Sequence, residues 1–297
     1  MNKSLYEKID PSGKWFTVDD RKAADDMGVK VASIIPDPGD FNYAKKGDIY
    51  DPYCRDLILG AGGQISDWKT EQNTDNDLII RGLGGTSQKA LKQCMEIGRT
   101  FYAIDTGYIQ PGKRKDYHRV TKNALQNLGP IKDRPLDRMR KLGWEYRKPK
   151  GGSYILVCPP SEKVMKFYGK DLDQWMKQTL DQIKSVTNAP IKIRLKPSRE
   201  DRVNNDTIWQ ALDDAICLVT YNSIAATEAL LYSVPAIALA PNAATVLCNT
   251  SIKDIPSNLN IPTKEELVSF VKHLSYCQFT AQEMANGLAW TILNEGS

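Results

Sequence analysis

The sequence predicts an α/β protein in which helices flank mainly parallel sheets. Two observations indicate this class. Short apolar runs alternate with helix-period segments through the second half of the chain, and a similar strand–loop–helix–strand unit occurs in the first half. The chain has 297 residues, of which 41% are hydrophobic and 26% charged, a composition typical of globular proteins. That length suits two domains, which we expect at residues 1–149 and 150–297.

The second half supplies the clearest elements. Apolar runs bounded by prolines or polar residues predict four strands, at residues 153–159, 191–196, 215–220 and 234–240. Helical spacing of apolar residues predicts helices at 171–187, around 208–212, and at 222–232, with Asn205 or Asp206 capping the second. Two closing helices are predicted from the capping boxes Thr263/Glu266 and Thr280/Glu283. Strands alternating with helices imply right-handed crossovers and a parallel sheet.

The first half is less regular. Residues 29–35 predict a strand, and a second unit begins at Asp77 with a strand at 77–81. A glycine-rich turn at 82–85, a helix at 86–98 and a strand at 100–105 follow, with Gly98 in the position of a helix-ending glycine. The polar, Pro/Gly-containing stretch 148–152 is the predicted hinge between the domains.

Several classes of protein and site are disfavoured by the residues present. No apolar stretch approaches the roughly 20 residues of a spanning helix, and the first 15 residues contain no signal-peptide core, so we expect a cytoplasmic protein. The six cysteines form no CxxC pair and are expected to be reduced. Only two histidines are present, so we expect no metal site.

Charge is concentrated in one segment. Residues 113–150 contain 13 Lys/Arg and 4 Asp/Glu, a local net charge of +9, so the rest of the chain carries 4 − 9 = −5. Basic residues interleaved with aromatic ones are typical of a surface that binds a polyanion, and a solvated linker is the alternative. The residues predicted to contact a polyanionic acceptor in or beside this segment are Tyr108, Tyr117, His118, Arg119, Lys122 and Trp144.

Ligands of open α/β sheets bind beyond the carboxyl ends of the strands. In the first half, a glycine-rich turn whose backbone could approach a phosphate or sugar follows the strand at 77–81; its members are Gly82, Gly84, Gly85 and Thr86. Asp105 ends the next strand, where it could act as general base or nucleophile, or simply cap a turn.

In the second half, Arg194, Lys196 and Ser198 follow a strand, and the two cations could neutralise a diphosphate or form a solvated edge. The next strand leads into a helix with Asn222, Ser223, Thr227 and Glu228 near its start. Small residues in the first turn would let a ligand approach the positive end of this helix. Glu228 stands among apolar neighbours, so a buried carboxylate there needs a polar partner such as ribose hydroxyls.

These motifs together resemble those of GT-B glycosyltransferases. Residues 228–235 (EALLYSVP) resemble the E-A-L-x-x-G-x-P signature of the GT-B donor domain, and residues 194–197 (RLKP) resemble the R-x-H-P element of capsule-polysaccharide transferases of the Kdo and sialic acid type. RGLGG at 81–85 with YAIDTGYI at 102–109 resembles the N-terminal element of those enzymes, and CQFTAQEMANG at 277–287 is similar to closing helices of phage-encoded relatives. Lys196, Ser233 and Asp105-Thr106 depart from the family's His, Gly and Glu-Asp.

The resemblance implies two Rossmann-like domains that face a cleft, with the nucleotide-sugar donor (a UDP- or CMP-sugar) in the C-terminal domain. It implies donor roles for Arg194, Lys196, Ser223 and Glu228, and a catalytic role for Asp105, which as a base would give inversion and as a nucleophile retention. It also implies catalysis without a metal, because helix dipoles and cations can stabilise a departing phosphate.

The basic segment and the phage-encoded relatives favour an acceptor hydroxyl on a hydroxymethylated pyrimidine in phage DNA, an acceptor located in the host cytoplasm. An enzyme that modifies such a base must extrude it from the duplex. Two alternatives stay open: a transferase for capsule or lipid-linked glycans, and a non-catalytic module that binds nucleotides or nucleic acid.

Overall fold

The structure is a computed structural model that describes residues 30–34, 52–67, 76–83, 85–109, 116–196 and 208–295. The chain forms two compact units. Unit 1 comprises Met1–Gly107, Lys115–Leu125 and Cys277–Ser297, and unit 2 comprises Tyr108–Arg114 and Gln126–Tyr276. This division differs from the predicted ranges 1–149 and 150–297, because the chain returns to the first sheet after residue 276 and because 126–149 packs with the second unit.

The sheet of unit 1 has six strands in the order β10-β5-β4-β3-β1-β2. The bounds are β1 (Lys30–Ile34), β2 (Gly63–Asp67), β3 (Leu78–Arg81), β4 (Phe101–Thr106), β5 (His118–Lys122) and β10 (Gln278–Phe279). Strands β1 to β4 pair in parallel, whereas β5 runs antiparallel to both β4 and β10. The predicted strands at 29–35, 77–81 and 100–105 are confirmed, but β5 lies inside the segment that we had interpreted as a basic surface.

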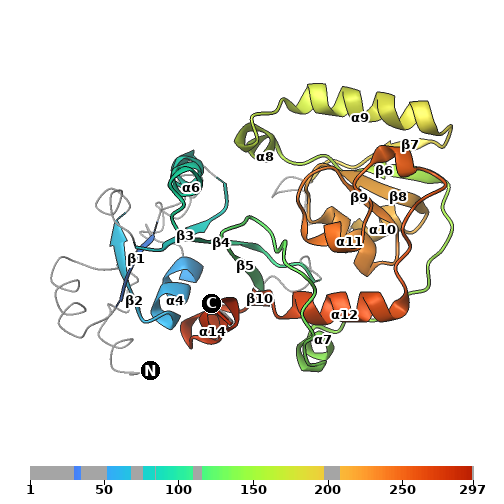
Figure 1. The fold of residues 1–297 in the computed structure, drawn as a ribbon. Coiled ribbons are helices and arrows are strands. Elements are labelled where there is room, and N and C mark those ends of the chain that lie inside the picture. Colours follow the sequence, from blue (N-terminus) through green and yellow to red (C-terminus); the bar gives the residue numbers. More distant parts are fainter. Residues whose placement is uncertain are drawn as a thin grey trace. The chain divides into compact units, whose positions relative to one another are not determined.

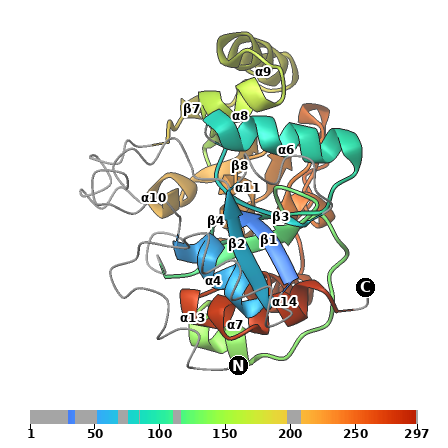
Figure 2. The ribbon, with the colours of Figure 1, turned by 90° about the vertical axis from the view of Figure 1, so that its left-hand side faces the viewer.

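The helices in the described part of unit 1 are α4 (Pro52–Gly60), α6 (Gly85–Ile97), α13 (Ala281–Ala285) and α14 (Leu288–Leu293). Helices α4 and α6 lie on opposite faces of the sheet (Figures 1 and 2). The core on one face joins Leu57, Ile79, Tyr102 and Phe279, all with at most 2% of their surface exposed. Gly98 has a φ of +70°, as a helix-ending glycine requires, so this prediction is confirmed.

Unit 2 is built on a parallel four-stranded sheet in the order β7-β6-β8-β9. The bounds are β6 (Tyr154–Val157), β7 (Ile191–Ile193), β8 (Ala215–Thr220) and β9 (Ala236–Ala238), which confirms the four predicted strands. After β6 the chain crosses to one side of that strand to form β7, whereas β8 and β9 extend the sheet on the other side. The strand order therefore reverses between β6 and β8, the position at which ligands bind in open α/β sheets.

The helices of unit 2 are α7 (Asp137–Leu142), α8 (Glu162–Phe167), α9 (Leu172–Val186), α10 (Ile208–Leu212), α11 (Ala225–Leu231) and α12 (Lys264–Ser275), with 3-10 turns at Ala243–Val246 and Ile252–Asp254. Helix α9 lies along one face of the sheet and α11 along the other (Figure 1). Trp175 and Ile183 of α9 join the sheet residues Ile155 and Val219 in the core. Asp171 caps α9, whereas the predicted caps Asn205 and Asp206 lie outside the described residues.

Both predicted capping boxes are confirmed. Thr263 and Glu266 exchange hydrogen bonds at the start of α12, and Thr280 and Glu283 do so at the start of α13. None of the helices in the described part of the chain is long and apolar enough to cross a membrane.

Candidate functional site

The carboxyl edge of the unit 2 sheet gathers the residues that follow its strands. Cys158 follows β6 and its amide nitrogen donates to the carbonyl oxygen of Val219 in β8, at 2.9 Å. Arg194 follows β7, and its amide nitrogen donates to the carbonyl oxygen of Val157 at 2.9 Å. These bonds extend the sheet by one residue on each side of β6, so Cys158 and Arg194 are held next to each other at the strand-order reversal.

Glu228 of α11 lies within the electrostatic reach of this edge. Burial raises the pKa of its carboxyl group to about 7, and the positive charges of Arg194 and Lys196 partly oppose that rise. The same Arg194 and Glu228 charges act on the Cys158 thiol, whose pKa burial raises to about 12. The predicted donor residues Arg194, Lys196 and Glu228 thus lie close enough for the two positive charges to act on one partly buried acid.

The loops around this cluster are fixed by amide side chains. Gln126 donates from Nε2 to the carbonyl oxygen of Asn222 at 2.5 Å and accepts from the amide nitrogen of Ala243 at 3.3 Å. Asn242 donates from Nδ2 to the carbonyl oxygen of Ser223 at 2.8 Å. The ends of β8 and β9 are therefore tied to each other and to residue 126, which gives the site a preformed frame.

The remaining predicted donor residues have different surroundings. Ser223 accepts at Oγ from the amide nitrogen of Ala225 at 3.2 Å, a local turn just before α11, and remains partly exposed. Thr227 is completely buried, and its Oγ1 has no hydrogen-bond partner among the described residues, so its donor role stays a prediction. Ser198 lies outside the described residues.

Two tyrosines, Tyr168 and Tyr221, lie beside this edge, and no sequence motif predicted their place there. The Tyr168 hydroxyl forms a side-chain hydrogen bond with Asn222, and its ring meets Tyr221 edge-on with centroids 5.5 Å apart. The ammonium of Lys170 lies 5.8 Å from the Tyr221 ring centroid. Burial raises the pKa values of both tyrosines, so both hydroxyls stay protonated at neutral pH. This group holds Asn222, a predicted donor residue, in place.

Asp105 ends β4 in unit 1 and is held by its neighbours on two sides. Arg119, directly across on β5, binds the carboxylate with Nη2–Oδ2 at 2.8 Å and donates from Nη1 to the carbonyl oxygen of Thr106 at 2.7 Å. The Thr106 amide nitrogen donates to Oδ1 of Asp105 at 2.7 Å. The Arg119 side chain is 8% exposed and that of Asp105 is 49% exposed, so a buried guanidinium presents a carboxylate to solvent.

A second cluster in unit 1 surrounds the end of β3. Arg81 Nη2 lies 3.1 Å from Nε2 of His118, and its guanidinium lies 4.6 Å from the ring centroid of Tyr53. The His118 and Tyr53 rings are 3.8 Å apart. Arginine can only donate, so Nε2 of His118 is the acceptor in this contact. The sequence did not single out Arg81 or Tyr53, whose contacts are non-local.

The predicted glycine-rich turn is described only in part. Gly82 has a φ of +71° and donates from its amide nitrogen to the carbonyl oxygen of Ile104 at 3.1 Å, a conformation that favours glycine. Gly85 is the first residue of α6, followed by Thr86, while Gly84 lies outside the described residues.

The predicted acceptor surface is wrong for most of its members. Tyr108, Tyr117, His118, Arg119 and Trp144 each have at most 9% of their surface exposed. Two of them form hydrogen bonds within the protein: the Tyr108 hydroxyl accepts from the amide nitrogen of Asn127, and Trp144 Nε1 donates to the carbonyl oxygen of Leu231. Lys122 is partly exposed and donates to Asn294 Oδ1 at 2.7 Å. Buried aromatic rings cannot stack on nucleobases.

Comparison with known proteins gives limited information. No family model matches the chain, and no curated protein matches it. Among solved structures, the chain is similar to Thermosulfurimonas dismutans KpsC, described as a beta Kdo 2,7 transferase, with a TM-score of 0.44 and 14% sequence identity. That similarity covers 90% of this chain and 100% of the other.

Proposed function

We propose that the protein is a glycosyltransferase that takes a sugar from a nucleotide-sugar donor, a UDP- or CMP-sugar, and transfers it to a hydroxyl group. The observation that carries this proposal is the convergence of Arg194, Lys196 and Glu228 at the point where the strand order of unit 2 reverses. Cations beside an acid at this edge suit a nucleotide, whose phosphates are anionic and whose ribose hydroxyls donate hydrogen bonds.

In this proposal different side chains of unit 2 bind different parts of the nucleotide. Arg194 and Lys196 bind phosphate oxygens and stabilise the negative charge that develops as the nucleotide departs. Glu228, once ionised, accepts hydrogen bonds from ribose hydroxyls. Asn222 and Ser223 contribute polar groups at the end of β8.

Asp105 of unit 1 is the proposed catalytic base. Its carboxylate would accept the proton of the acceptor hydroxyl as that oxygen attacks the anomeric carbon and the bond to the nucleotide phosphate breaks, with inversion at that carbon. Arg119 orients the carboxylate and leaves about half of the side chain exposed for the acceptor. If Asp105 attacked the anomeric carbon itself, the product would instead retain configuration.

The donor site is tested by calorimetric titration of UDP and CMP, each alone and as a nucleotide sugar. We expect Glu228→Ala to weaken binding by about 1–3 kcal/mol and Arg194→Gln to weaken it by a similar amount, because each loses charged hydrogen bonds. Lys192→Gln is the matched control, since Lys192 lies on β7, two residues before Arg194, and its ammonium lies over the ring of Tyr154. Equal affinity of wild type and both site variants would refute the donor assignment.

The acceptor is tested separately, by the mass increase of candidate acceptors incubated with donor and protein. One arm uses duplex DNA with hydroxymethylated pyrimidines, the acceptor predicted from the sequence, and the other uses a capsular or lipid-linked oligosaccharide. The buried rings of Tyr117 and Trp144 remove the stacking surface that had supported DNA, so DNA contact would depend on exposed cations such as Lys148. Donor binding without transfer to either acceptor or to water would indicate the non-catalytic alternative.

A further inference from the structure

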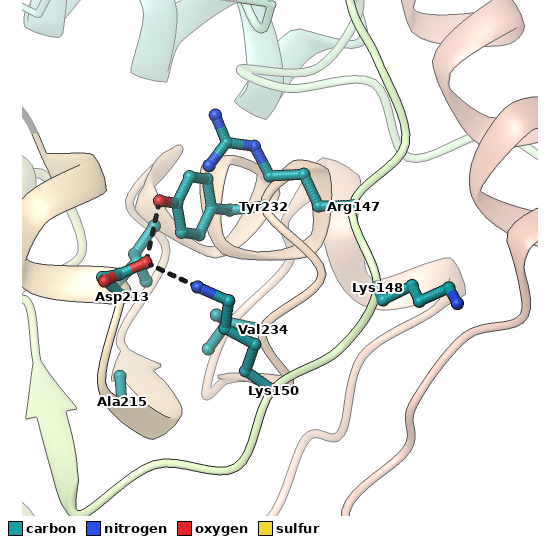
Figure 3. A pocket seen from close by; sticks show the side chains of 8 residues that line it. Arg147, Lys148, Lys150, Asp213, Ala215, Tyr232 and Val234 are labelled. Atoms are coloured by element: carbon teal, nitrogen blue, oxygen red, sulfur yellow. Dashed lines mark hydrogen bonds and ion pairs between the residues drawn. The ribbon is translucent and has the colours of Figure 1, made fainter.

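A small pocket with a largely apolar lining lies at the amino edge of the unit 2 sheet. It is lined by Arg147, Lys148, Lys150, Leu212, Asp213, Ala215, Tyr232 and Val234, and its cavity volume is about 30 Å³ (Figure 3). Ala215 begins β8 and Val234 precedes β9, whereas the proposed donor site lies beyond the carboxyl ends of the same strands. The pocket is therefore separate from that site by the length of the sheet.

The cations reach the pocket from a fixed segment. Residues 144–150, which we name the basic strap, cross this edge of unit 2 without regular secondary structure. Trp144 donates from Nε1 to the carbonyl oxygen of Leu231 at 2.9 Å, and Ser233 donates from Oγ to the carbonyl oxygen of Arg147 at 2.5 Å. Two hydrogen bonds to the end of α11 thus hold the strap before any ligand arrives.

Arg147 is also positioned by its side chain. Its guanidinium lies 4.2 Å from the ring centroid of Tyr232, and Figure 3 shows it above that ring. A guanidinium that stacks on an aromatic ring keeps its N–H groups, which lie at its edge, available for an anion. The Arg147 residue itself is exposed, so those donors face solvent rather than the core.

Asp213 links the other polar groups of the pocket. Its Oδ1 accepts from the Tyr232 hydroxyl at 3.2 Å and pairs with Lys150 Nζ at 3.3 Å. The side chains of Lys150 and Asp213 are 72% and 58% exposed, and such exposed pairs contribute little stability. Lys150 can therefore exchange Asp213 for a stronger anion at small cost.

We propose that this pocket binds a phosphate group, with Arg147 and Lys150 as its principal ligands and Lys148 at the rim. Arg147 and Lys150 against the single carboxylate of Asp213 leave the pocket positive, while the Lys148 side chain points away from these groups (Figure 3). The apolar floor of Leu212, Ala215 and Val234 provides no competing hydrogen-bond acceptor from its side chains. The enclosed cavity has room for only one or two water molecules, so the phosphate would lie at the open mouth of the pocket, beside Arg147 and Lys150. This inference does not depend on glycosyl transfer.

The proposal makes predictions of opposite sign for neighbouring residues. Arg147→Gln and Lys150→Gln should each weaken phosphate binding by about tenfold, because each removes a charged hydrogen bond. Asp213→Asn should strengthen it by about fivefold at most, because the carboxylate no longer competes for Lys150. A non-specific effect of positive surface charge would not depend on which cation is removed.

The experiment is a calorimetric titration with inorganic phosphate, ribose 5-phosphate and a single-stranded oligonucleotide, in a chain that carries Arg194→Gln and Lys196→Gln to silence the proposed donor site. Lys166→Gln is the control, because Lys166 forms only an exposed pair with Glu162 on α8. Thermal unfolding verifies that each variant is folded. If Arg147→Gln is unfolded, Arg147→Lys, which keeps the charge, replaces it in the titration.

The expected result is saturable phosphate binding that Arg147→Gln and Lys150→Gln reduce, Asp213→Asn increases and Lys166→Gln leaves unchanged. Tighter binding of the oligonucleotide with a steep salt dependence identifies a phosphodiester as the source, and preference for the monoesters identifies a small phosphate metabolite. The proposal is overturned if no probe binds, or if the three pocket variants bind with wild-type affinity.

Discussion

The raised pKa of the Glu228 carboxyl group makes the stability of the protein depend on pH. In the unfolded chain its carboxyl group ionises near its ordinary pKa of 4.5, whereas burial raises the folded-state pKa to about 7. The folded state therefore holds a proton that the unfolded state has already lost over this interval. The contribution of Glu228 to stability is fully present below about pH 4.5 and is lost as the pH rises to about 7.

Replacement of Glu228 by Gln should remove this dependence. We expect the unfolding free energy of wild type to fall relative to that of Glu228→Gln between about pH 4.5 and 7, by at most about 3 kcal/mol, and to stay level above that interval. Urea denaturation at a series of pH values measures the difference. Parallel curves for the two proteins would show that burial does not shift this carboxyl group.

Asp105→Asn should separate catalysis from donor binding. The amide keeps the size of the side chain but cannot accept a proton, so we expect transfer to slow by about 10²-fold or more, as is typical for loss of a general base. Nucleotide affinity should stay at the wild-type value, because the proposed base acts on the acceptor hydroxyl and the nucleotide is bound by Arg194, Lys196 and Glu228 in this proposal. An unchanged transfer rate would remove Asp105 from the mechanism.

The sequence predicted part of the candidate site at this scale. Arg194, Lys196 and Glu228 could be found because each directly follows, or belongs to the helix that follows, a predicted strand, and strand ends share one edge of a parallel sheet. Tyr168 and Gln126 could not, because their roles come from hydrogen bonds to residues 54 and 96 positions away in the chain, both to Asn222. Tyr117 and Trp144 were misjudged because charge density in the sequence does not reveal which side chains a fold buries.

At the scale of elements, local signals were sufficient where the stabilising contacts are local. A capping box needs only four consecutive residues of the sequence, and both predicted boxes form. Strand β5 had no such signal. His118 and Arg119 are polar, but pairing with β4 and β10 buries them both, and those partners are distant in the sequence.

The cap of α12 gives a quantitative test of the local argument. Thr263→Ala removes the oxygen that accepts from the Glu266 amide nitrogen at 3.2 Å, and we expect a loss of about 1 kcal/mol in unfolding free energy. Thr263→Ser keeps the oxygen and should remain close to wild type. Chemical denaturation of both variants decides the point, and equal losses would mean that the hydroxyl is irrelevant.

At the scale of the whole molecule, each unit is completed by distant segments. Unit 1 takes β10, α13 and α14 from the end of the chain. A Cβ atom placed on Gly60 of α4 would lie only 1.8 Å from the carbonyl oxygen of Met284 in α13, so glycine is needed where these helices meet. No local sequence pattern predicts this contact, because the two residues lie 224 positions apart.

Gly60→Ala should therefore destabilise unit 1, whereas Gly151→Ala should not, because a Cβ atom on Gly151 meets no atom within 4 Å. We expect a loss of about 1–3 kcal/mol for Gly60→Ala, the usual cost of overpacking, measured by thermal or chemical unfolding. Similar stability of the two variants would show that α4 and α13 can separate without cost.

The central claim is that a nucleotide is held at the carboxyl edge of the unit 2 sheet. A crystal structure with a bound nucleoside diphosphate tests it most directly. The account predicts phosphate oxygens within hydrogen-bond distance of Arg194 and Lys196, and ribose hydroxyls on the Glu228 carboxylate. A nucleotide bound at another place, with Glu228 and Arg194 uncontacted, would contradict it.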